Sequence, residues 1–317
     1  MLAATLLALG SAVIHASWNL LIKTSGDRAL AAWGQFLAAA LLAIPAVAIV
    51  GPPGWEVAPY LAATGLVHVV YIESLVAAFT HGDFSLSYPL ARGGGAVLAA
   101  VGSVVFLGDR LPVPAWMAIA VAGAGLISLR GGRGVPAAAD VVLGDVGEPR
   151  TGTTDARPAS TAASSPATAR RRAGERAALG FALLTAVCIA SYTLVDSAGS
   201  RVSTDGVAYA LCSVATSGVA ITALNLAQPR RRRRAALLVS QWRRNVAGGL
   251  GTTVAYTMVL VAVREAPVGY VTMLRESSVV IGALIGWLVL KEGLGARRLM
   301  SSAVILAGLV LLVAFGR

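Results

Sequence analysis

Ionisable side chains lie within strongly apolar stretches of this sequence, where each charge costs at least about 2.5–3.5 kcal/mol on the membrane-insertion scale. Side chains that carry such a cost normally face a cavity or an ion-pair partner, so their types indicate which chemistry the protein can do. The planar fork of arginine binds carboxylate or phosphoryl groups, and a carboxyl group in an apolar site can carry a proton. The residues in question are His15, His68, Glu73, Arg92, Asp196, Arg275 and Glu276.

The two arginines are the best candidates for substrate binding. Each lies seven or eight residues into its apolar stretch, which is about 11–12 Å deep and close to the midplane of a ~30 Å hydrocarbon core. Tyr88 lies one turn before Arg92 on the same helix face. We therefore expect Arg92, Arg275 and Tyr88 to contact an anionic group. The alternative is structural ion pairing of the arginines with Glu73 or Glu276.

A second polar face lies in the first apolar stretch. His15, Trp18 and Asn19 follow the spacing i, i+3, i+4 and share one side of a helix. A shift of 174 residues places the segment at 16–19 on 190–193, which brings Tyr192 and Thr193 to equivalent positions. These residues are expected to form a cavity wall, the alternative being hydrogen bonds between helices.

Glu73 and Glu276 are the candidates for proton coupling. His68 and Glu73 are five residues apart, or about 140° around a helix, so they cannot both point squarely into one narrow cavity. Glu73 is the preferred cavity residue of the two, and Glu276 competes with it for the proton-carrying role. Asp196 lies near the end of its apolar stretch and has a simpler interpretation, contact with the membrane interface.

The composition determines which elements must position these side chains. The chain has 317 residues, of which 56% are hydrophobic and 13% charged, and its mean hydropathy is +0.74. These values exclude a water-soluble globule and a disordered chain. A helix needs about 20 apolar residues to cross a membrane, and only helices satisfy their own backbone there in a chain of this pattern. The sequence therefore predicts an all-α integral membrane protein with ten transmembrane helices, near residues 2–23, 29–50, 58–79, 84–107, 113–129, 177–198, 205–226, 245–264, 268–290 and 298–315.

The ten stretches fall into two related halves. Residues 131–176 are rich in Gly, Pro, Ala, Ser and Thr and lack an apolar period, which predicts a disordered linker between residues 1–130 and 177–317. A shift of 183 residues places Arg92 on Arg275 and Asp109 on Glu292. A duplicated unit with five crossings enters the bilayer from the opposite side the second time, which predicts an inverted repeat with a site near the midplane.

Several segments carry a resemblance to a known family. They are HASWNLLIK (15–23), YPLARGGG (88–95), FLGDRL (106–111), LRESSVV (274–280) and LVLKEGLG (288–295). With them, the chain resembles the ten-helix members of the drug/metabolite transporter superfamily, which are built from two EamA-type repeats. The resemblance covers nearly the whole chain apart from the linker. It implies a central cavity, lined mainly by helices one, three and four of each half and exposed alternately to the two sides.

The resulting functional hypothesis is a secondary active transporter of a small polar metabolite, zwitterionic or anionic, acting as an exporter. A flippase for a lipid-linked substrate is the alternative, and a membrane-embedded enzyme is a weaker one, because HExxH, DDxxD and GxSxG motifs are absent. Cys188 and Cys212 lie in apolar stretches without a CxxC pair, so no metal or cofactor is expected. The expected partners are the substrate and membrane lipids and not nucleic acid, with a homo-oligomer left open.

The basic residues predict an orientation. Of the 26 Lys and Arg residues, 20 follow predicted helices one, three, five, seven and nine, and four lie on the other side. Without the eight in the long linker the ratio is still 12 to four. The positive-inside rule then places the basic loops in the cytoplasm and both termini outside, in a multi-pass protein of the inner (plasma) membrane. Similar ten-helix transporters usually keep both termini in the cytoplasm, so the charge pattern departs from the family here.

Overall fold

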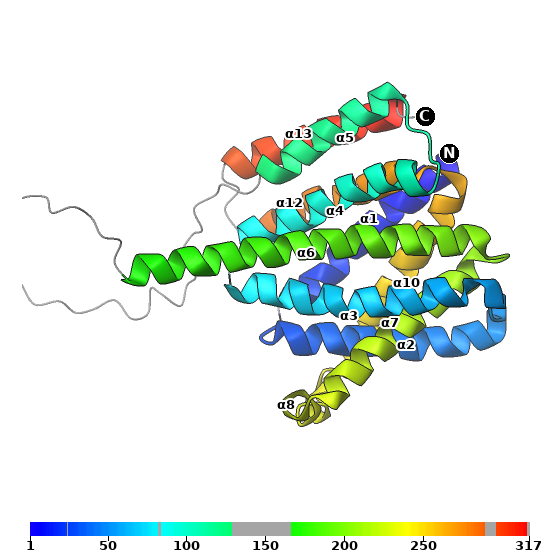
Figure 1. The fold of residues 1–317 in the computed structure, drawn as a ribbon, viewed down its shortest axis with the longest axis vertical. Coiled ribbons are helices and arrows are strands. Elements are labelled where there is room, and N and C mark those ends of the chain that lie inside the picture. Colours follow the sequence, from blue (N-terminus) through cyan, green and yellow to red (C-terminus); the bar gives the residue numbers. More distant parts are fainter. Residues whose placement is uncertain (24, 82–83, 129–165, 289–295, 316–317) are drawn as a thin grey trace, which may run out of the picture.

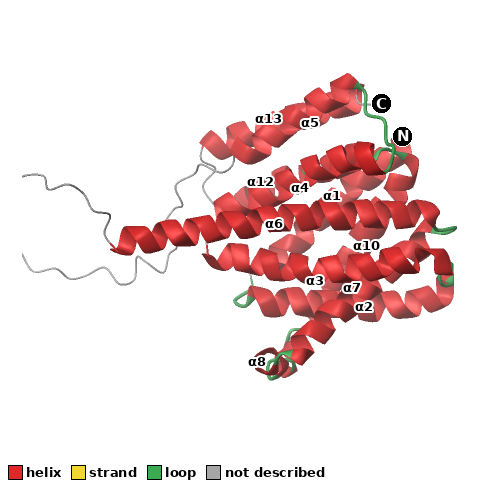
Figure 2. Ribbon diagram, in the orientation of Figure 1, coloured by secondary structure: helices red, strands yellow, loops and turns green. Residues whose placement is uncertain are grey.

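The computed structural model describes residues 1–23, 25–81, 84–128, 166–288 and 296–315. Within these ranges it describes all side chains except those of residues 18–23, 28, 79, 84–89, 127, 166–173, 282–283, 285–288 and 296–299. Every regular element in this part of the chain is a helix (Figure 2).

The helices coincide with the predicted apolar stretches. The first five are α1 (Leu2–Lys23), α2 (Arg28–Val50), α3 (Ala58–His81), α4 (Phe84–Phe106) and α5 (Val113–Ser128). The others are α6 (Pro166–Val202), α7 (Gly206–Ala227), α10 (Trp242–Glu265), α11 (Val268–Arg275), α12 (Ser277–Leu288) and α13 (Ala296–Phe315). Three short elements connect them, η1 (Trp55–Val57), α8 (Pro229–Arg232) and α9 (Ala236–Ser240).

Five of these segments are long and apolar enough to cross a membrane by length and composition. They are Ala29–Val50, Trp55–Ala78, Gly174–Val202, Gly206–Ala227 and Trp242–Glu265. The described parts of α1, α4, α5 and α13 add shorter apolar helices. The predicted stretch at 268–290 is divided into α11 and α12, which meet at Glu276. An all-helical membrane architecture is therefore confirmed at this level.

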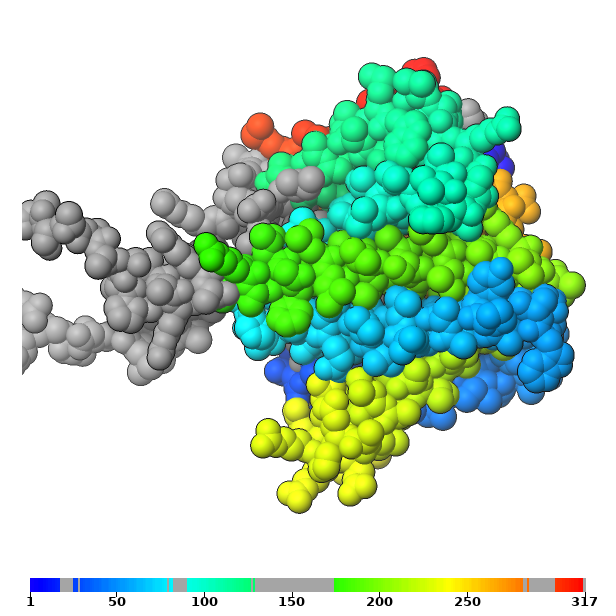
Figure 3. Space-filling model, viewed as in Figure 1, coloured from blue at the N-terminus to red at the C-terminus, as the bar shows by residue number. Residues whose placement is uncertain are grey.

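The main helix contacts join the early and late parts of the chain. α6 packs against α3 and α4, α1 against α10, α2 against α7 and α10, and α5 against α13. In Figure 1, α6 runs through the middle of the bundle while α5 and α13 lie together at one edge. Figure 3 shows that side chains fill the gaps between the ribbons on this face, with the α8 region projecting from the rest. A site at the centre must therefore draw on both parts of the chain.

Small residues allow these close approaches. A Cβ atom on Gly218 of α7 would lie 2.4 Å from the Phe36 carbonyl oxygen of α2. A Cβ on Gly308 of α13 would lie 2.6 Å from the Ala122 backbone nitrogen of α5. Only glycine lets the backbones of neighbouring helices come this close. The high glycine content of the sequence thus serves helix packing at these two crossings.

The chain ends and the basic segment lie at opposite ends of the bundle. The N-terminus and the end of α13 are at one end, and α8 and the start of α6 are at the other (Figure 1). The predicted disordered linker lies outside the described residues as far as residue 165. Its last part, 166–176, is helical and belongs to α6, which corrects the predicted boundary. Proline suits a first helical turn, and the Ala and Arg residues after it favour helix, so α6 extends beyond its apolar part.

Candidate functional site

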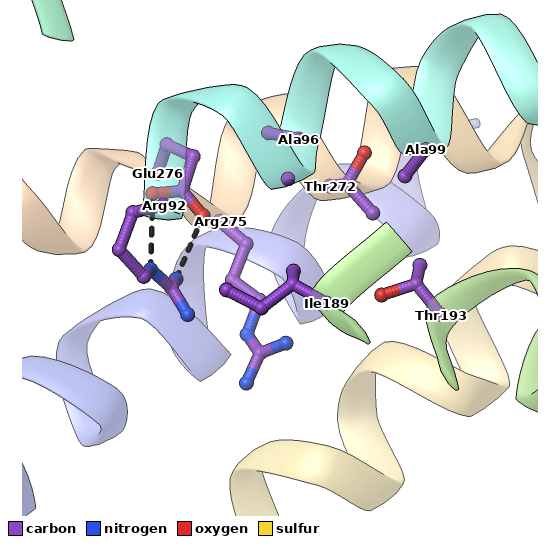
Figure 4. A pocket seen from close by; sticks show the side chains of 9 residues that line it. Arg92, Ala96, Ala99, Ile189, Thr193, Thr272, Arg275 and Glu276 are labelled. Atoms are coloured by element: carbon purple, nitrogen blue, oxygen red, sulfur yellow. Dashed lines mark hydrogen bonds and ion pairs between the residues drawn. The ribbon is translucent and has the colours of Figure 1, made fainter. Parts of the chain in front are cut away.

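A cavity of about 60 Å³ lies among the helices. About one probe sphere of 10–15 Å³ is needed for a water molecule, so the cavity has room for a few waters or for part of a small solute. Helices from both parts of the chain supply its walls, which are aromatic, hydroxyl-bearing and basic. The lining residues are His15, Phe36, His68, Tyr71, Arg92, Tyr192, Val214, Ser217, Thr252, Tyr256 and Arg275. A smaller hollow of about 10 Å³ shares Arg92 and Arg275 with it (Figure 4).

Arg92 on α4 is held by a carboxylate from the other half of the chain. Its Nη2 donates to Glu276 Oε1 at 2.7 Å and its Nε donates to Glu276 Oε2 at 3.3 Å. Both residues are buried, and Figure 4 shows the two hydrogen bonds side by side. This two-point geometry satisfies the carboxylate with the guanidinium that faces it. The expected structural pairing thus occurs for Arg92, but Glu276 is the partner and not Glu73.

The chain break between α11 and α12 places Glu276 for this contact. α11 ends at Arg275, α12 begins at Ser277, and the Glu276 backbone N–H bonds to the Met273 carbonyl at the turn between them. Adjacent residues on a helix point about 100° apart, so Arg275 and Glu276 face different neighbours. Glu276 therefore turns to α4, while the Arg275 guanidinium is directed away from that pair (Figure 4).

Arg275 keeps hydrogen-bonding capacity that the protein does not use. Its Nη2 lies 3.5 Å from His15 Nδ1, at the limit of a hydrogen bond. Its guanidinium carbon lies 5.9 Å from the centre of the Tyr256 ring, in cation–π range. Its Nε is buried without a hydrogen-bond partner, as is the hydroxyl of Ser217, which also lines the cavity. Buried polar groups are usually satisfied, so these donors point to a group that binds here.

Aromatic rings form the opposite wall around His68. The His68 ring stacks on Tyr192, with centroids 4.4 Å apart and planes at 30°. Tyr71, Phe36 and Tyr256 meet the same imidazole edge-on, with centroids 6.0, 6.2 and 6.3 Å away. Such contacts fix the orientation of the imidazole and give the cavity a rigid apolar wall.

Behind this wall, Asp196 of α6 is completely buried. Its Oδ1 accepts from the Tyr209 hydroxyl at 2.8 Å and the Ser213 hydroxyl at 3.1 Å. Its Oδ2 accepts from the Thr64 hydroxyl at 2.8 Å and from the Tyr256 hydroxyl. These four donors from three other helices match the four lone-pair positions of a carboxylate. The expectation that Asp196 reaches the interface is wrong, because α6 continues past it to Val202 and surrounds it with hydroxyl groups.

Four of the predicted substrate-binding residues, His15, Arg92, Tyr192 and Arg275, line the cavity. The side chains of Trp18, Asn19 and Tyr88 lie outside the described ones.

Glu73 does not line the cavity. It pairs with Arg231 of α8, at 2.5 Å between Oε1 and Nη1, and 38% of its side-chain surface is exposed. Of the two α3 residues that cannot share the cavity, His68 faces it and Glu73 faces the basic segment instead.

Sequence reasoning missed several members of the site. Phe36, Ser217 and Thr252 lie on three different helices, and none belongs to a local motif. The available signal was weak, namely a hydroxyl or aromatic side chain within each apolar stretch. Tyr256 was visible only as the repeat counterpart of Tyr71, at a shift near that of the arginines.

An ion-pair cluster joins helix ends on the side of the chain termini. Arg201 of α6 donates to Asp109 Oδ1 at 2.8 Å, and Asp109 Oδ2 accepts the Val268 backbone N–H at 2.7 Å. Arg201 also donates to the Val263 carbonyl at 2.9 Å. The acidic residue of the FLGDRL segment therefore ties the end of α4 to α6 and to the start of α11.

Comparison with known proteins agrees with this architecture. The family described as EamA-like transporter family matches residues 176–314. No curated protein matches the sequence significantly. Among solved structures 27 chains match, and one crystal structure superposes over 99% of this chain and 98% of its own with a TM-score of 0.67 at 17% identity. At that identity the likeness concerns the fold alone. Through residues 176–314 the chain therefore belongs to the EamA-like transporter family, and it is a multi-pass membrane protein of the drug/metabolite transporter type.

Proposed function

We propose that this chain is a secondary transporter that carries a small anionic metabolite, or a zwitterion held by its anionic group, through the cavity between its two halves. The single observation that carries this proposal is the buried Nε of Arg275, which has no partner although it lies beside a cavity. Arg92 already serves Glu276, so Arg275 is the arginine that offers an unfilled donor.

The charges around the cavity favour an anion. Two arginines and two histidines are among its lining residues, and no carboxylate is among those that the structure describes. Asp196 lies behind the wall with its oxygens filled by hydroxyl donors, and Glu276 is taken up by Arg92. A cation would find no acceptor of opposite charge here, while a carboxylate or phosphate would meet the Arg275 fork.

Alternating access in a ten-helix inverted repeat is part of the proposal. In its favour, each predicted stretch coincides with a helix or, at 268–290, with two consecutive helices. The two arginines that match at a shift of 183 residues also come from different halves to one cavity. Inverted-repeat transporters place their sites at such a repeat interface near the midplane.

The proposal also places the α8 end in the cytoplasm. The run at 230–234 consists of arginines, and four of them are exposed. Arginines in a short loop favour the cytoplasmic face and its anionic lipids. Both chain ends would then lie outside the cytoplasm.

Uptake into proteoliposomes tests the proposed substrate class. Vesicles with purified protein would be incubated with a defined panel of small carboxylates, phosphate esters, amino acids and amines, and their contents measured by mass spectrometry. We expect accumulation of anionic panel members, loss of it in Arg275→Gln, and normal uptake in Arg110→Gln, which changes an exposed arginine. Accumulation of amines alone, or equal uptake by Arg275→Gln, would contradict the proposal.

A further inference from the structure

The hydrogen bonds of His68 determine which of its nitrogens can take up a proton. Nδ1 lies 2.9 Å from the backbone carbonyl oxygen of Thr64 and 3.1 Å from the Thr64 hydroxyl. A carbonyl oxygen only accepts, so Nδ1 carries the hydrogen of the neutral ring. Nε2 is then the nitrogen with a lone pair. Because His68 lines the cavity, this lone pair is the basic position next to the space where a solute binds.

A buried negative charge lies on the far side of His68. The Thr64 hydroxyl that contacts Nδ1 donates to Asp196 Oδ2 at 2.8 Å, so one hydroxyl group separates the imidazole from the carboxylate. Within the described part of the chain, no arginine or lysine forms an ion pair with Asp196. An imidazolium at His68 would supply the nearby positive charge that a buried carboxylate lacks.

Arg275 acts on His68 in the opposite sense. Both side chains line the same cavity, and His68 lies within electrostatic reach of both Asp196 and Arg275. While the cavity holds no anion, the positive charge of Arg275 repels a second positive charge on the ring. An anion bonded to Arg275 cancels that repulsion, because charges interact strongly where water is excluded. The anion therefore controls whether His68 can be protonated.

We propose that the cavity binds a small anion and one proton together: the anion bonds to Arg275, and a proton from the adjoining water adds to Nε2 of His68. The inference rests on the proposed function for the anion. When the anion leaves, Arg275 again repels the imidazolium and Nε2 returns its proton to water. Coupling of this kind is reciprocal, so protonation of His68 strengthens anion binding by the same factor. Proton and anion then cross the membrane as one unit.

Other titratable groups also face His68 and set the background for this coupling. Tyr192 and Tyr256 contact its ring, and Tyr209 reaches it through Asp196. Arg92 is neutralised by Glu276, which leaves Arg275 and Asp196 as the opposing charges. The full set is Tyr71 on α3, Asp196 and Tyr192 on α6, Tyr209 on α7, Tyr256 on α10, Arg275 on α11, His15 on α1 and Arg92 on α4.

Nuclear magnetic resonance of the ligand-free protein tests the charge coupling directly. The chain has three histidines, so isotope-labelled imidazoles give few signals, and His68→Gln identifies the one from His68. We expect a neutral ring with hydrogen on Nδ1. Arg275→Gln should raise the titration midpoint of His68 by about one pH unit or more. Arg275→Glu, which places a carboxylate beside the cavity, should raise it further.

Matched variants separate charge from shape. Arg275→Lys keeps the positive charge, so the His68 midpoint should stay near that of the unmodified protein. Arg110→Gln removes an exposed arginine and should leave the midpoint unchanged. Asp196→Asn removes the negative charge behind the ring and should lower the midpoint. If the Asp196 variant does not fold, the Arg275 series still decides the question.

The outcomes distinguish this inference from the proposed function. Equal His68 midpoints in the unmodified protein, Arg275→Gln and Arg275→Glu would overturn the proton coupling and leave anion transport standing. Hydrogen on Nε2 of the neutral ring would overturn it as well. Where the panel yields a transported anion, His68→Gln should abolish acceleration of its uptake by an imposed pH gradient. Uptake that is insensitive to Arg275 would instead overturn the proposed function and the place of the anion in this inference.

Discussion

Arg92 and Arg275 occupy equivalent positions in the two related halves, yet their surroundings differ. Arg92 forms two hydrogen bonds with the Glu276 carboxylate, and both side chains are buried. Arg275 has a marginal contact with His15, a ring face at Tyr256 and an Nε without a partner. A duplicated chain can thus use one copy of a residue to hold its helices together and the other for a ligand.

The largest effect is expected where the buried pair loses one partner. Glu276→Gln leaves the Arg92 charge buried without its counter-charge, which should destabilise the fold by about 3–5 kcal/mol. Thermal unfolding of the purified protein in detergent would measure this loss. The double variant Arg92→Gln with Glu276→Gln removes both charges and should recover most of it. A double variant as unstable as the single one would show that the pair does more than neutralise charge.

A smaller change in stability, with a full loss of transport, is expected at Arg275. Arg275→Gln removes a charge that no acid of the described chain balances, so the unfolding temperature should change little. Uptake in the vesicle assay should fall to the background of empty vesicles. Arg275→Lys keeps the charge but lacks the planar fork, and we expect weaker substrate binding with partial transport. Strong destabilisation of both variants would make Arg275 a structural residue like Arg92.

The smallest effect is expected at the Glu73–Arg231 pair. Glu73 is 38% exposed and Arg231 33%, and ion pairs with such access to water contribute about 0–1 kcal/mol. Glu73→Gln should therefore leave folding, transport and its pH dependence near those of the unmodified protein. If Glu73→Gln abolished the pH dependence while His68→Gln retained it, Glu73 would be the proton carrier and His68 would not.

The helices and the importance of the buried charges could be predicted from the sequence. Apolar length determines where a chain can cross a membrane, and a charge in such a stretch needs compensation wherever the helix goes. Arg92, Arg275, His15 and Tyr192 were found for this reason. The family was also identifiable, because its motifs are local in sequence.

The tertiary structure decided which partner each charge has. Glu276 follows Arg275 directly, but adjacent side chains on a helix diverge, and the helix packing brings Glu276 to Arg92 instead. Glu73 lies within an apolar stretch, but α8 brings Arg231 to it and away from the cavity. Asp196 was underrated because its four hydroxyl donors come from α3, α7 and α10. Pairing of side chains depends on the rotation and crossing of helices distant in sequence, which hydrophobic periodicity does not encode.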